Sequence, residues 1–240
     1  MLNKRMLKTI ALLALPALFL FTACDPTAIS GNGDIVTETR DDKDFTGLEV
    51  SVPGKVVVLS GSTFNVKVQA EENLLPYLKT DVELGNLHIY FSRNVRDVDG
   101  LVVTVTMPEL KYVNLSGSAI LESNSTFTGL LLDMDVSGSG AIKMKNVSYD
   151  MLILEVSGSG HIDMDGDATE VKATISGSGQ VNTLDCPVKK ADVHLSGSGK
   201  VSVNVSDLLI AHISGSGEVW YQGNPVVNAD ITGSGDLKKI

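Results

Sequence analysis

The residues best suited to chemistry stand in a short motif of serine and glycine that recurs along the chain. It reads Ser-Gly-Ser-Gly or a near copy, and its copies begin at Ser116, Ser137, Ser157, Ser176, Ser196, Ser214 and Thr232. A serine nucleophile on a sharp turn would need the pattern Gly-x-Ser-x-Gly, with His and acidic partners elsewhere. The motif lacks that spacing, and hydrolases do not repeat their nucleophile along one chain. We therefore interpret these serines as turn residues and predict no catalytic residue.

A column of polar residues, two positions before each motif, offers the one candidate metal site. In three successive copies this residue is His194, His212 and Asp230. If the copies stack as strands, the three side chains lie about 4.8 Å apart. Imidazole and carboxylate groups are common ligands of transition metals. The alternative is an ordinary solvated polar face, which the outer side of a sheet normally carries.

Two other stretches approach known ligand-binding loops without completing their patterns. Gly197-Ser-Gly-Lys200 lacks the length of a phosphate-binding loop. Residues 163–167 (DMDGD) place neither the glycine nor the glutamate where an EF-hand needs them. No cofactor is therefore expected.

Two adjacent aromatic residues, Trp220 and Tyr221, follow the sixth copy of the motif. Exposed aromatic side chains often hold sugar rings or protein partners, so this pair is a candidate ligand-binding site. The alternative is that the pair covers the C-terminal end of the core, where no further repeat stacks.

The spacing of the motif predicts the elements that carry these side chains. Successive copies start 18 to 21 residues apart. The residues one and three positions before each copy are apolar and the residue between them is polar, which indicates a strand with one buried face. Such a period is typical of a solenoid, whose coils bury their apolar faces by stacking. We predict an all-β parallel β-helix, right-handed like most parallel crossovers, with its regular repeats over residues 111–240.

Residues 35–110 lack the motif but are rich in short β-branched and aromatic runs separated by turn residues. No segment there shows a sustained helical period. We expect this stretch to be an irregular, β-rich N-terminal part of the same solenoid.

The first 23 residues read as a bacterial lipoprotein signal peptide. Lys4, Arg5 and Lys8 precede an apolar run over residues 10–21, too short to span a membrane, and Thr22 and Ala23 lead to Cys24. Cys24 is the expected lipidation site, and residues 24–34 are expected to form a flexible tether. The protein is then anchored in the bacterial cell envelope, with the outer membrane favoured and either the periplasm or the cell exterior as its surroundings.

The charge of the chain argues against nucleic acid as a partner. Without residues 1–23 the 19 basic residues fall to 16 against 29 acidic ones, a net charge of −13. We expect such a surface to repel both nucleic acid and anionic lipid.

The lipoprotein signal, the β-rich first half and the Ser-Gly-Ser-Gly coils together resemble the head GIN domain family of auto-transporter adhesins. The resemblance implies a right-handed parallel β-helix in the cell envelope and brings no catalytic motif with it. The favoured hypothesis is a non-enzymatic, lipid-anchored adhesin that binds a surface glycan or protein. The alternatives are an envelope scaffold or signalling module that binds a periplasmic protein and, from a third class, a polysaccharide-active enzyme.

Overall fold

A computed structural model describes residues 27–240, so the expected signal peptide and Cys24 lie outside the described residues. Within these bounds the regular structure consists of strands alone, which confirms the all-β prediction. Residues 27–240 also contain no apolar helix of membrane-spanning length.

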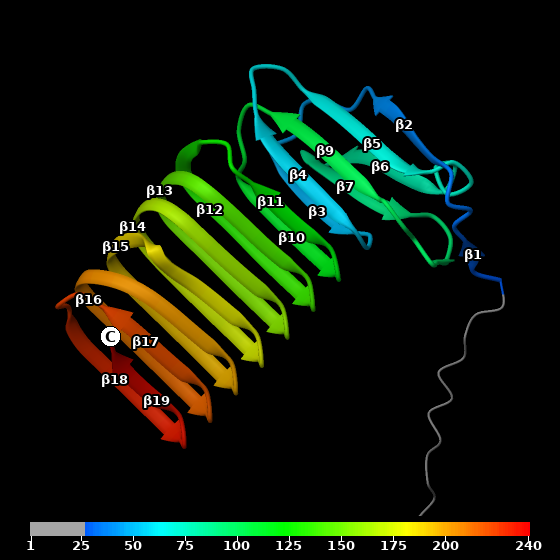
Figure 1. Ribbon diagram of the computed structural model, residues 1–240. Coiled ribbons are helices and arrows are strands. Elements are labelled where there is room, and N and C mark those ends of the chain that lie inside the picture. Colours follow the sequence, from blue (N-terminus) through cyan, green and yellow to red (C-terminus); the bar gives the residue numbers. More distant parts are fainter. Residues whose placement is uncertain (1–26) are drawn as a thin grey trace, which may run out of the picture.

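Parallel coils stack in sequence order along the C-terminal half of the chain (Figure 1). Each coil runs into a Ser-Gly turn and continues on the other side as the next strand. The coils are formed by β10 (Tyr112–Gly117), β11 (Ile120–Ser123), β12 (Phe127–Gly138), β13 (Ala141–Gly158), β14 (His161–Gly177), β15 (Gln180–Gly197), β16 (Lys200–Gly215), β17 (Glu218–Gln222), β18 (Val226–Gly233) and β19 (Asp236–Lys239). The stack is a β-solenoid of about six turns, as the repeat predicted.

The apolar columns of the repeat form the core of the solenoid. The residues one position before the motif are at most 2% exposed in the inner coils: Leu115, Val136, Val156, Ile175, Leu195 and Ile213. In the last described coil the corresponding Ile231 is 42% exposed, because no further described strand stacks on β18.

The motif itself is a turn in which successive backbones nearly touch. Gly177 has a φ of +126°, and an added Cβ would lie 2.5 Å from the carbonyl oxygen of Gly158 in the coil below. Only glycine tolerates both conditions. Successive turns are joined by backbone hydrogen bonds, such as Ser178 N to Gly158 O at 2.8 Å. The serines therefore act mainly through their backbone.

The N-terminal part forms coils that stack out of sequence order (Figure 1). The coil of β3 (Gly47–Ser51) and β4 (Lys55–Ser60) lies between β10 and β11 on one side and β7 (Asn86–Phe91) and β9 (Val102–Met107) on the other, all in parallel. Antiparallel strands then close this end: β2 (Ile35–Arg40), β5 (Asn65–Glu71) and β6 (Leu78–Glu83). We call this antiparallel end the N-terminal cap.

The segment that precedes the cap is bound to it. β1 (Ile29–Ser30) pairs in parallel with β8 (Val95–Arg96). The carboxylate of Glu71, only 2% exposed, accepts hydrogen bonds from the backbone N–H groups of Gly33 at 2.7 Å and Asp99 at 3.1 Å. Residues 29–33 are thus held against the fold, whereas the sequence led us to expect a tether as far as residue 34.

We predict that replacing Gly177 with Ala lowers the free energy of unfolding by about 3 kcal/mol, because strain at positive φ adds to overlap with Gly158. Gly117→Ala is the matched control. Gly117 has a φ of +111° in the first copy of the motif, but nothing lies within 4 Å of its added Cβ. We expect Gly117→Ala to lower the free energy of unfolding by only about 1 kcal/mol, measured by urea denaturation. Equal losses for the two variants would show that stacking clearance is unimportant.

Candidate functional site

Trp220 is held on the outer face of the solenoid near its C-terminal end. Strand alternation in β17 buries Val219 and turns Trp220 outward. The indole Nε1–H donates a hydrogen bond to Glu218 at 3.0 Å, and the same carboxylate accepts one from Lys238 Nζ at 2.9 Å. Lys200 Nζ lies 3.2 Å from the centroid of the Trp220 ring, a cation–π contact. We call Lys200, Glu218, Trp220 and Lys238 the Trp220 cluster.

The cluster is an electrostatic unit built across three coils. The hydrogen bond from Lys238, followed by that from Trp220, lowers the pKa of Glu218 from its ordinary value. In turn Glu218, and then Asp236, raises the pKa of Lys238. Lys238 is already paired with Glu218 and Asp236, whereas Lys200 makes no ion pair within residues 27–240. The cluster thus offers one unpaired ammonium group beside a fixed indole, which suits a ligand that combines a flat apolar surface with a carboxylate.

Tyr221, the other aromatic candidate, points the opposite way. It is the next residue along β17, and its partly buried side chain packs against the hydrophobic core of the solenoid. Tyr221 therefore helps to cover the core, and the outward-facing aromatic residue of the pair is Trp220.

The polar column forms the expected row on the outer face. The rings of His194 and His212 stack with centroids 4.9 Å apart, and Asp230 follows in register. Each imidazole turns to a different carboxylate, His194 Nε2 lying 3.1 Å from Asp192 and His212 Nδ1 lying 4.0 Å from Asp230. Nowhere in residues 27–240 do three or more His, Cys, Asp or Glu side chains gather so as to hold a metal ion. The row borders a shallow depression of about 250 Å³.

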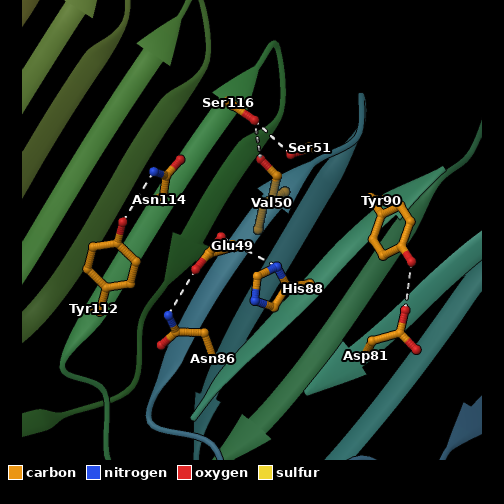
Figure 2. A network of polar contacts seen from close by, with 10 residues as sticks. All are labelled: Glu49, Val50, Ser51, Asp81, Asn86, His88, Tyr90, Tyr112, Asn114 and Ser116. Carbon is orange, nitrogen blue, oxygen red and sulfur yellow. Dashed lines mark hydrogen bonds and ion pairs between the residues drawn. The ribbon is translucent and has the colours of Figure 1, made fainter. Parts of the chain in front are cut away.

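The same column continues across the N-terminal coils, where the sequence did not reveal it. Glu49 of β3 pairs in register with Asn114 on one side and His88 on the other. Figure 2 shows its carboxylate between His88 Nδ1, at 3.4 Å, and Asn86 Nδ2, which donates a hydrogen bond at 2.9 Å. Next to it the hydroxyl groups of Ser51 and Ser116 lie 2.7 Å apart. These contacts join coils that are distant in sequence.

A larger and similarly open cavity, of about 460 Å³, lies beside β8 and the ends of β3 and β7 in the N-terminal part of the fold. It is lined by Ala28, Ser51, Pro53, Phe91, Arg93, Asn94, Val95 and Arg96. The sequence did not lead us to predict this cavity, although Arg93 and Arg96 stand three positions apart in the stretch SRNVR.

We predict that Lys238→Ala raises the pKa of Glu218 towards its ordinary value, because the variant removes the strongest interaction that favours the ionised carboxylate. Titration of the Glu218 side chain by carbon-detected NMR measures this. Lys189→Ala, at an exposed lysine outside the Trp220 cluster, should leave the Glu218 titration unchanged. An unaltered Glu218 pKa in Lys238→Ala would contradict the contact.

Comparison with solved structures places the fold among proteins described as adhesins. A putative adhesin from Bacteroides fragilis superposes with a TM-score of 0.84 at 19% identity, covering 89% of this chain and 100% of that one. A putative adhesin and a putative lipid binding protein, both from Parabacteroides distasonis, give TM-scores of 0.70 and 0.72 at 25% and 27% identity. Each covers 89% of this chain, which spans 100% and 99% of their lengths. No curated protein matches the chain.

The family comparison agrees with the repeat. The family model described as "Putative auto-transporter adhesin, head GIN domain" matches residues 44–225, from the start of the first coil to the turn after β17. This match covers most of the chain and includes both the out-of-order N-terminal coils and the regular repeats. The chain belongs to the head GIN domain family of auto-transporter adhesins.

Proposed function

We propose that this protein is a non-enzymatic adhesin, anchored in the bacterial cell envelope by lipid on Cys24, which binds a surface glycan or protein through the Trp220 cluster. Membership of an adhesin family supports a function at the cell surface or in the envelope. The signal sequence over residues 1–23, which ends in Thr-Ala directly before Cys24, supports the anchor.

The observation that carries the binding role is the fixed outward indole of Trp220. Its Nε1–H is held by Glu218 and its ring is in contact with the Lys200 ammonium group. A rigid aromatic group costs little entropy on binding and often dominates recognition. Lys200, whose ammonium group makes no ion pair within residues 27–240, favours a partner that carries carboxylates, such as an acidic glycan or an acidic protein surface.

The row arrangement of the polar side chains supports a binding protein over an enzyme. Catalysis of glycosidic cleavage places two carboxyl groups at a defined separation around one bond. In the outer column, polar groups instead follow one another at the spacing of stacked strands, and His194 and His212 each face a separate carboxylate. This arrangement presents a repeating surface to a partner.

Protease shaving of intact cells tests exposure. We expect the folded region to be cut or released from whole cells while periplasmic marker proteins survive. The Cys24→Ala variant should no longer fractionate with membranes. Protection of the wild-type chain in intact cells would contradict an adhesin and favour an envelope scaffold with a periplasmic partner.

A glycan array containing acidic and neutral glycans tests the binding residue. We expect Trp220→Ala to weaken binding at least about tenfold, as loss of an aromatic anchor does. Tyr90→Ala is the matched control, because Tyr90 is also an outward aromatic residue whose hydroxyl is held by a carboxylate, that of Asp81 at 2.8 Å. Equal binding by the wild type and the Trp220 variant would overturn the assignment of the site.

A further inference from the structure

The cavity at the N-terminal end differs in charge from the rest of the molecule. Two of its eight lining residues are arginines, and none is acidic. The whole chain has 29 acidic against 19 basic residues, so a cavity wall with only positive charge is unusual for it. Arginine is the side chain best suited to hold phosphate, because its planar group donates several hydrogen bonds at once.

The guanidinium groups of both arginines can still bind an anion. Arg93 lies over the ring of Tyr77, 5.5 Å from its centroid, and no carboxylate of residues 27–240 comes within ion-pair distance of it. Arg96 Nε is 3.8 Å from Asp97, a long contact on a side chain that is half exposed. The Asp97 carboxylate is also engaged by the hydroxyl of Ser30 at 2.7 Å.

The remaining wall of the cavity is largely apolar. Ala28, Pro53, Phe91 and Val95 face the same space as the arginines. A cavity with cationic groups beside apolar ones matches a ligand of mixed character, such as the phosphate and glycerol of a lipid headgroup.

The chain around the cavity is held in place before any ligand arrives. β1 and β8 pair beside it, and Asn73 Nδ2 donates a hydrogen bond to the carbonyl oxygen of Ser30 at 2.8 Å. The buried Glu71 fixes the backbone at Gly33 and Asp99 on the same side. Fixed walls reduce the entropic cost of binding.

The cavity also lies close along the chain to Cys24, the proposed lipid anchor. Ala28 lines it and stands four residues after Cys24, a reach of about 14 Å at full extension. We propose that the Arg93 and Arg96 cavity binds the phosphate headgroup of an anionic glycerophospholipid in the membrane that holds the anchor. This inference rests on the proposed lipid anchor. Binding there brings β8 and the ends of β3 and β7 to the membrane, whereas β17, the strand of Trp220, lies near the opposite end of the stack of coils (Figure 1).

The test measures how close each end of the protein lies to the membrane. The full lipidated chain is reconstituted into vesicles of phosphatidylcholine, with or without phosphatidylglycerol, that contain nitroxide-labelled headgroups. A fluorophore is placed at Ser92→Cys beside the cavity or at Ser234→Cys at the far end, both exposed positions. Cys186 does not interfere, because it is fully buried and burial raises the pKa of its thiol to about 12.

We expect phosphatidylglycerol to increase quenching at position 92 and not at position 234. Arg93→Glu with Arg96→Glu should abolish the increase, reducing the docked population about tenfold or more, since each basic residue near an anionic membrane contributes substantially to binding. Lys145→Glu with Lys189→Glu makes the same change in net charge at exposed positions outside the cavity and should preserve the increase.

Each contrary result has a distinct meaning. The headgroup site is overturned if phosphatidylglycerol does not increase the quenching at position 92. It is also overturned if the two double variants reduce this increase equally. Loss of the increase in millimolar inorganic phosphate at constant ionic strength shows a site for free phosphate and overturns the lipid assignment. Release of the wild-type chain from phosphatidylcholine vesicles by a wash contradicts the anchor instead, and sedimentation of the released chain with phosphatidylglycerol vesicles then still tests the cavity.

Discussion

Close stacking of backbone on backbone at the glycine turns is the constraint on which this structure depends. At each turn a serine N–H binds the glycine carbonyl of the coil below, at 2.8 to 3.0 Å from Ser139 to Ser234. The missing Cβ of the intervening glycine makes this approach possible. Because every turn stacks in the same way, the residues next to it pair in the same register in successive coils, and the register shifts lie away from the turns, as between Asp163 and Asp165. The apolar columns beside the turns merge into a continuous core.

A stack of this kind arranges polar groups in rows. Side chains in equivalent positions of successive coils meet at strand spacing, as the stacked rings of His194 and His212 do. Such rows rarely bring several different groups around one small molecule, but they give long, fixed surfaces. Local departures from the repeat add individual features to these surfaces, such as the Trp220 ring in contact with Lys200 and Lys238.

The two ends of the solenoid are physically different. Antiparallel strands close the N-terminal end, and the incoming segment is fastened there by Glu71 and by the pairing of β1 with β8. Arg93 and Arg96 line a cavity beside β8 in this part of the fold. β17, the strand of Trp220, lies near the other end of the stack (Figure 1). The proposed anchor and the proposed binding site thus lie in different parts of the fold, which suits the proposed adhesin.

The sequence by itself determined the repeat, the inward columns, the glycine turns and the row of His194, His212 and Asp230, because stacked strands repeat their environment at a fixed interval. Only the tertiary structure decided the order of coils at the N-terminal end, where residues 47–60 enter between residues 86–107 and 112–123. It also decided that Trp220 faces out while Tyr221 faces in, and that Arg93 and Arg96 share a cavity with Ala28 and Ser51. These features depend on contacts between segments that share no repeat. The residue pattern of one segment therefore does not predict where it meets the other.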